Sequence, residues 1–223
     1  MLITALTPDP RQPGYLVVEA DRARYASLPL EVVHQLELAE GVEVRGELAQ
    51  RLKRAADVES AYQVATRLLA MRPRSVYEML ARLRERGHDP GAAATAVGRL
   101  ETARVLDDAA YARHFARVRA SRGHGAARLL HDLLAKGVDR RVAERAIAEV
   151  LDANGVDPLA QARALAEKRL AQLQDVPPRQ RRRRLLAYLA RRGFRGRAVQ
   201  ELVSELLRAA GRGADPGPGG GAA

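Results

Sequence analysis

A helix-ending spacing recurs three times along the chain and constrains its fold more than any other feature. Each copy reads Leu-x-x-Leu-x-x-x-Gly, and the copies end at Gly87, Gly137 and Gly193. A glycine directly after a helix can adopt the left-handed conformation, which costs other residues about 1–2 kcal/mol. Aliphatic residues follow each glycine at the same two offsets, ten and thirteen residues later: Val97 and Leu100, Ile147 and Val150, Val203 and Leu206. Three joints in register predict tandem helical repeats.

The residue that follows each glycine also fits a helix end. In a Schellman cap this residue packs on the side chain four positions before the glycine. The expected pairs are Leu133 with Val138 and Leu189 with Phe194, while Leu83 has the poorer partner His88.

The second repeat shows the pattern of a single repeat most clearly. Asp107 and Asp108 offer side-chain acceptors and negative charge to the start of its first helix. From Tyr111 to Val118, apolar residues recur at steps of three and four, which gives that helix an apolar face. Two further helices follow, the last of which begins near Asp139. One repeat therefore consists of three helices.

These patterns predict a mostly α-helical protein, with tandem three-helix repeats in an elongated, curved array behind a small N-terminal α+β module. We expect a strand-and-helix module over 1–56, three-helix repeats over 57–106, 107–155 and 156–210, and a disordered Gly/Pro/Ala tail over 211–223. Within the module, alternation and β-prone residues predict strands over 2–7, 15–20, 22–28 and 41–44, and a short helix over 29–38. A helix over 47–54 then leads to a separate one over 60–71.

Charge is the strongest indication of a partner. The net charge is +11 and the sequence pI is about 10.8, which favours a polyanionic partner. The only lysines are Lys53, Lys136 and Lys168, so the basicity is carried by arginine, a bias that a GC-rich genome also produces. The chain has no cysteine, no basic-then-apolar N-terminal signal and no apolar run of membrane-spanning length. We therefore expect a cytoplasmic protein with no membrane partner.

One segment concentrates this charge: residues 179–197 hold nine arginines and no acidic residue. A helix with Leu185, Leu186 and Leu189 inward places a basic stripe on its opposite side. We name this set the α-helical basic stripe, and its members are Arg181, Arg184, Tyr188, Arg191 and Arg192. Guanidinium groups and one aromatic ring suit phosphates and stacking, or an acidic protein groove. A weaker stripe of Arg113, Arg117 and Arg122 on the first helix of the second repeat is expected to be ordinary solvated surface.

Signatures of catalysis are missing from the sequence. The five histidines show no metal-ligand spacing, and neither HExxH nor a GxxxxGK[ST] phosphate loop occurs. The Gly123-His-Gly125 segment lacks the third glycine and the preceding strand of a dinucleotide site. Asp107 and Asp108 are better explained as helix-capping residues than as a metal or acid–base pair. We expect a protein without catalytic activity, cofactor or metal.

With these residues placed, the chain resembles the RecX family of recombinase regulators. The residues that carry the resemblance are Arg74-Ser75-Val76-Tyr77-Glu78-Met79, Leu106-Asp107-Asp108-Ala109-Ala110-Tyr111-Ala112 and Arg191-Arg192-Gly193-Phe194. The resemblance covers about residues 61–207, and departures from the family pattern include Met79 in place of leucine, His88 and the Gly-rich tail. It implies a curved row of three-helix repeats and a role for the motif residues Asp107, Asp108, Tyr111, Gly87, Gly137, Gly193 and Phe194 in maintaining it.

The resemblance also implies a function. Such a protein would bind the RecA recombinase in the helical groove of the RecA–DNA filament and inhibit ATP hydrolysis, strand exchange and co-protease activity. The resemblance leaves open whether the protein contacts RecA, single- or double-stranded DNA, or both. Two other interpretations remain from the residues alone: a helix-turn-helix protein that reads duplex DNA, and a helical-repeat scaffold for protein partners.

Overall fold

The computed structural model describes residues 1–153, 155 and 157–212. Its first part is a three-stranded antiparallel sheet. The strands β1 (Ile3–Pro8), β2 (Tyr15–Ala20) and β3 (Ala23–Pro29) pair in the order β1-β2-β3, and α1 (Leu30–Gln35) follows. Ile3, Val18 and Leu28 are fully buried in its core. The fourth strand expected over 41–44 is wrong, because this segment forms only a single bridge, between Leu2 and Glu43.

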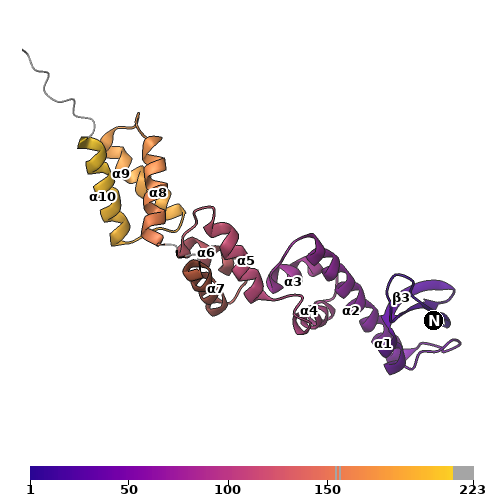
Figure 1. Ribbon diagram of the computed structural model, residues 1–223. Coiled ribbons are helices and arrows are strands. Elements are labelled where there is room, and N and C mark those ends of the chain that lie inside the picture. Colours follow the sequence, from indigo (N-terminus) through magenta and orange to yellow (C-terminus); the bar gives the residue numbers. More distant parts are fainter. Residues whose placement is uncertain (154, 156, 213–223) are drawn as a thin grey trace, which may run out of the picture. The chain divides into compact units, whose positions relative to one another are not determined.

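A single long helix connects the sheet to the first three-helix repeat. Helix α2 (Gly46–Met71) is continuous (Figure 1), which corrects the two separate helices expected over 47–54 and 60–71. The intervening residues Ala-Ala-Asp-Val-Glu contain no glycine or proline, so nothing in the sequence ends the helix there. Its N-terminal half buries Leu52 in the sheet core, and its C-terminal half buries Ala65 and Leu68 in the core of the first repeat.

The remaining helices form the repeats. They are α3 (Val76–Glu85), α4 (Pro90–Thr102), α5 (Asp108–Ala120), α6 (Ala126–Leu134), α7 (Arg140–Ala153), α8 (Pro158–Ala171), α9 (Pro178–Arg191) and α10 (Arg197–Arg212). The first repeat comprises the C-terminal half of α2 with α3 and α4, the second α5–α7 and the third α8–α10, and each has its own apolar core. The mostly α-helical class with tandem three-helix repeats and a strand-containing N-terminal module is confirmed.

The chain divides into two compact parts, residues 1–108 and the residues from Ala109 onward, so the elongated, curved arrangement stays a prediction. Helix α10 continues through Gly211 to Arg212, which corrects the start of the tail expected over 211–223. Residues 213–223 of that tail lie outside the described residues.

The three repeat glycines have the left-handed conformation expected at the joints. Their φ angles are +83° at Gly87, +73° at Gly137 and +92° at Gly193. At the third joint the Phe194 N–H donates to the carbonyl of Leu189 (2.9 Å), and the Gly193 N–H donates to the carbonyl of Ala190 (3.1 Å). The other two joints have the same pair of bonds, which is the Schellman pattern.

The first joint replaces the missing apolar contact with a polar one. His88 lies with its Nδ1 3.0 Å from an oxygen of Asp57 on α2, and the N–H of Asp89 donates to the other oxygen of that carboxylate. One α2 side chain therefore holds the α3–α4 joint at the position where the other joints bury an aliphatic or aromatic residue.

A buried carboxylate links the sheet to the first repeat. Glu59 on α2 is only 2% exposed. It accepts a hydrogen bond from the Tyr15 hydroxyl on β2 (2.8 Å) and another from the Arg99 guanidinium on α4 (2.7 Å). Burial, followed by the hydrogen bond to Glu59, raises the pKa of Tyr15. Because a buried carboxylate is costly unless it is paired, these contacts hold β2, α2 and α4 together.

Tyr15→Phe should lower the free energy of unfolding by about 1.5–3 kcal/mol, since it removes one hydrogen bond to a charged group. The control is Tyr25→Phe, whose half-exposed ring makes no hydrogen bond to a described residue and which should change stability by less than about 0.5 kcal/mol. Urea unfolding followed by circular dichroism measures both. Equal effects of the two changes would contradict the proposed role of Glu59.

Candidate functional site

Helix α9 presents the α-helical basic stripe, but not as a uniform surface. Leu185 and Leu189 are fully buried, whereas Leu186 is only half-buried. Three members of the stripe are half-buried: Arg181, Tyr188 and Arg192. They lie four, three and seven residues from Leu185, respectively, so they share its side of the helix. Their expected position opposite the core is therefore wrong, and only Arg184 and Arg191 of the stripe are exposed.

Arg181 is occupied by the chain itself. Its guanidinium donates to the carbonyls of Val176 (2.7 Å) and Gln174 (2.6 Å) in the connection between α8 and α9. It therefore stabilises this connection and is not a free cation. Arg184, by contrast, makes one long hydrogen bond of 3.3 Å, to Gln180 of its own helix, among the described residues.

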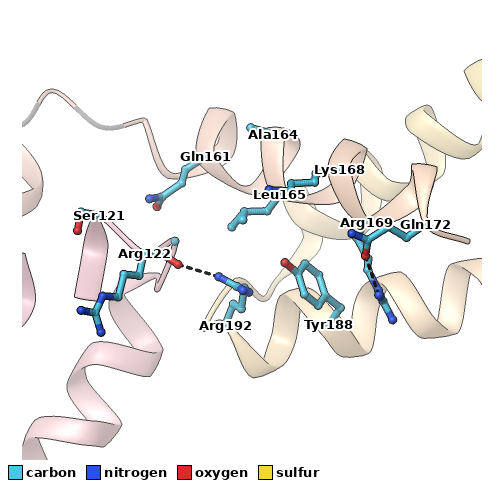
Figure 2. A pocket seen from close by; sticks show the side chains of 11 residues that line it. Ser121, Arg122, Gln161, Ala164, Leu165, Lys168, Arg169, Gln172, Tyr188 and Arg192 are labelled. Atoms are coloured by element: carbon cyan, nitrogen blue, oxygen red, sulfur yellow. Dashed lines mark hydrogen bonds between the residues drawn. The ribbon is translucent and has the colours of Figure 1, made fainter. Parts of the chain in front are cut away.

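Tyr188 and Arg192 line a groove of about 670 Å³ between the second and third repeats. Figure 2 shows this basic groove, whose walls come from the α5–α6 connection, α8 and α9. Its residues are Ser121, Arg122, Gly123, Gln161, Ala164, Leu165, Lys168, Arg169, Gln172, Tyr188 and Arg192. Four of these described residues are cationic and none is acidic.

Two guanidinium groups flank the aromatic ring of the groove. The Arg192 guanidinium lies 5.0 Å from the centre of the Tyr188 ring, and that of Arg169 lies 5.6 Å from it. In Figure 2 the two arginines lie on either side of the ring. Because both guanidinium groups make cation–π contacts with this ring, a stacking base would compete with them for it. The stacking role expected from the sequence is not supported by this arrangement.

The groove adjoins a close backbone contact between the two repeats, which we name the glycine seam. There the N–H of Gly125, just before α6, donates to the carbonyl of Arg192 (2.7 Å). The Arg192 side chain returns a hydrogen bond to the carbonyl of Arg122 (2.8 Å). A β-carbon at Gly193 would lie 2.5 Å from the backbone nitrogen of Arg128. Gly193 therefore ends α9 and also permits α6 to approach it.

Ion pairs are distributed unevenly over the second and third repeats. Outside the groove, arginines pair with acidic residues: Arg113 with Glu149, Arg128 with Asp132, Arg140 with Glu144, Arg163 with Glu205 and Arg197 with Glu201. Within the described part of the chain, none of the four groove cations forms an ion pair. The Nε atom of Arg169 is buried without a hydrogen-bond partner there. The groove thus holds uncompensated positive charge.

His124 adds a titratable group beside the seam. Burial, then Arg119 and Arg192, lower its pKa, and its Nδ1 atom has no hydrogen-bond partner among the described residues. The lowered pKa makes the ring less readily protonated than an ordinary histidine, so it adds little charge to the four cations.

The weaker stripe does not form one surface. Arg113 lies 3.9 Å from Glu149, and Arg117 is exposed on α5. Arg122 lies beyond the end of α5, which corrects its expected place on that helix, and it belongs to the groove. Sequence reasoning missed Lys168 and Arg169 on α8. The adjacent pair of cations is visible in the sequence, but only the packing of α8 against α9 shows which surface they join.

The paired aspartates lie at the start of α5, but Asp108 acts on a different helix from the one expected. Asp108 is the first residue of α5, and its carboxylate accepts a hydrogen bond from the N–H of Val76 at the start of α3 (2.9 Å). Burial is the main reason that its pKa is raised. Asp107 directly precedes α5. No group of three potential metal-ligating residues occurs in the described ranges.

The two motif aromatic residues are buried. Tyr111 is 8% exposed and stacks on Phe115, with 6.2 Å between ring centres, in the core of the second repeat. Phe194 belongs to the core of the third repeat, and a β-carbon at Gly125 would lie 3.0 Å from its ring. Phe194 therefore contributes to the core and to the seam.

The fold and this groove define a class of protein: tandem three-helix domains behind a small sheet, with a basic surface between the last two domains. Three sequence models, for the first, second and third three-helix domains of RecX, match residues 61–100, 107–147 and 156–203. The chain therefore belongs to the RecX family. No helix in the stretches that the structure describes is both long and apolar enough to cross a membrane.

Relatives and solved structures agree with this assignment. The chain is 37% identical over 158 residues to regulatory protein RecX of Halorhodospira halophila, covering 70% of this chain and 89% of the relative. It is 34% identical over 151 residues to that of Amycolatopsis mediterranei, covering 67% and 85%. A crystal structure of regulatory protein RecX matches with a TM-score of 0.72 at 20% identity, covering 92% of this chain and 98% of the other. That of RecX from Lactobacillus salivarius has a TM-score of 0.57 at 21% identity, covering 67% and 96%.

Gly193→Ala should destabilise the protein more than Gly87→Ala. Both glycines have a positive φ, so each change should cost about 1–2 kcal/mol. A β-carbon at Gly87 meets nothing within 4 Å, whereas one at Gly193 meets backbone and side-chain atoms of Arg128. This overpacking should add at least about 1 kcal/mol. Thermal unfolding compares the two variants, and equal losses would show that the seam is not tightly packed.

Acidification should weaken folding in part through His124. Its folded pKa is below the ordinary value of about 6.5, so the unfolded chain binds a proton first as the pH falls. The contribution of His124 to stability is therefore present above the unfolded pKa and decreases below it. His124→Gln should lose less stability than the wild type between about pH 7.5 and about pH 5.5. Thermal unfolding at the two pH values measures this difference, and parallel losses would contradict it.

Proposed function

We propose that this protein binds the RecA–DNA filament and inhibits ATP hydrolysis, strand exchange and co-protease activity by RecA. It would thereby regulate recombination and the DNA-damage (SOS) response in the cytoplasm, without catalysing a reaction itself. Membership of the RecX family supports the regulatory part of this proposal, since the relatives are regulatory proteins by name.

The observation that carries the proposal for this chain is the uncompensated charge beside the glycine seam. Arg184 and Arg191 are exposed on α9, and Arg192 on the same helix lines the basic groove. An acidic partner such as a nucleoprotein filament would compensate these charges, and electrostatic attraction would speed its encounter with the protein. We assign the filament contact to Arg184, Arg191 and Arg192, while Arg181 acts within the chain.

The test is inhibition of RecA ATP hydrolysis on single-stranded DNA by the wild type and by Arg184→Glu/Arg191→Glu. Both side chains are exposed, so the double variant should fold normally. Its half-inhibitory concentration should rise at least about tenfold, or about 1.4 kcal/mol, because two attractions become repulsions.

The matched control is Arg141→Glu/Arg145→Glu, which makes the same charge change at exposed positions of α7. It should inhibit nearly as well as the wild type. Equal inhibition by a well-folded Arg184→Glu/Arg191→Glu protein would exclude these residues. Binding to a specific duplex without RecA would instead favour the helix-turn-helix interpretation, and capture of protein partners with no effect on RecA would favour a scaffold.

A further inference from the structure

Four cations converge on the basic groove from two repeats. Arg122 comes from the α5–α6 connection of the second repeat, and Lys168, Arg169 and Arg192 come from α8 and the C-terminal end of α9 in the third. Like charges in one groove repel one another, and the described residues supply no carboxylate to relieve this repulsion. Several arginines elsewhere in the same two repeats form ion pairs, whereas none of the four cations that meet here does so among the described residues.

The available donors favour phosphate over other anionic groups. Arg192 uses one of its N–H groups on the carbonyl of Arg122, and Arg169 uses one on Gln172. Guanidinium groups carry five N–H donors each, so most of these donors are not used in those bonds. One carboxylate would balance only one of the four charges, whereas successive phosphates of a polyanion can balance several.

The geometry of Tyr188 selects against a base. Arg169 and Arg192 occupy the two sides of its ring (Figure 2). A nucleobase that stacked there would compete with the two guanidinium groups for the ring. Contacts in this groove would therefore be made to the sugar–phosphate backbone and would not depend on base identity.

We propose that the basic groove is a phosphate site that holds successive phosphate groups across the second and third repeats. The phosphates come from the backbone of single-stranded DNA or from a free inorganic polyphosphate. If the phosphates are those of DNA, this inference deepens the proposed function, on which it rests, by assigning the groove to the DNA component of the filament. Arg184 and Arg191 remain outside the groove.

The experiment measures binding of fluorescein-labelled oligo(dT), oligo(dA) and an abasic oligomer of equal length by anisotropy, with no RecA present. The three affinities should agree within about threefold, because the groove contacts no base. Four phosphate contacts on a single strand should give a slope of about −3 for log affinity against log salt concentration.

Two substitutions remove groove charge while leaving its backbone contacts intact. Arg122 supplies its carbonyl to Arg192 whatever its side chain, and Lys168 is exposed on α8. Arg122→Glu/Lys168→Glu should lower affinity at least about tenfold at low salt and reduce the slope by about half. Arg122→Gln/Lys168→Gln should halve the salt slope with a smaller loss of affinity. This variant replaces the glutamate variant in the test if the latter does not fold.

The matched control is Arg141→Glu/Arg145→Glu, which changes the net charge equally on α7, away from the groove. It should leave the salt slope unchanged. Equal slopes for the groove and control variants would overturn the proposal, as would affinities that follow base identity. Absence of binding to both oligonucleotide and tripolyphosphate would also overturn it.

Inorganic tripolyphosphate distinguishes the two sources. Weak competition against oligo(dT), at millimolar concentration, indicates the polynucleotide, whereas micromolar binding of tripolyphosphate with no oligonucleotide binding indicates free polyphosphate. Both results support a phosphate site. Because these measurements contain no RecA, they can fail while inhibition of RecA persists, and they can succeed while inhibition is absent.

Discussion

The hydrogen bond between the Gly125 N–H and the Arg192 carbonyl brings two helix ends together and determines what lies around them. It requires α9 to end immediately after Arg192, and Gly193 allows this because its φ is +92°. The same glycine leaves room for the backbone at Arg128. Where these backbones meet, Arg192 and Tyr188 line the groove beside the α5–α6 connection. A rule about helix termination therefore sets the position of the basic groove.

The N-terminal part of the chain is held by a different kind of interaction. Glu59 is buried between β2 and α4 and is balanced by a hydroxyl and a guanidinium group. Buried charges of this kind are tolerated only when their partners are well placed. The contact between sheet and repeat is consequently specific in geometry, whereas the repeat cores rely on aliphatic packing. The positive charge of Arg99 is thus compensated by Glu59, whereas the four cations of the basic groove have no carboxylate among the residues that line it.

Periodicity predicted the helices because the apolar residues recur at the helical spacing of three and four, and because a glycine ends the second helix of each repeat. The same reasoning failed where no local signal exists. The helices expected over 47–54 and 60–71 are one helix in the structure, α2, whose two halves contribute to two different cores. The expected stripe on α9 includes Arg181, Tyr188 and Arg192, although their spacing from the buried Leu185 puts them on its side of the helix. That Leu186 is less buried than Leu185 depends on the packing within the third repeat.

The candidate site, too, was predictable only where a local sequence pattern marks it. The arginine-rich composition of α9 was evident from the sequence, but its division into bonded, exposed and groove-lining side chains was not. Arg181 bonds to carbonyls that precede its own helix, and Asp108 bonds to a helix far earlier in the chain. Lys168 and Arg169 lack any distinguishing motif. Such contacts depend on tertiary structure, which a helical wheel for one segment does not contain.

The continuity of α2 has a consequence for how the N-terminal region can unfold and be exchanged. A helix shared by two hydrophobic cores cannot lose one half without fraying into the other, so the sheet and the first repeat form one cooperative folding element. Truncation at the nominal boundary near residue 56 would cut this helix between Leu52 and Glu59. The sheet module is therefore not a detachable appendage, and grafting it onto another chain would require transfer of the whole helix.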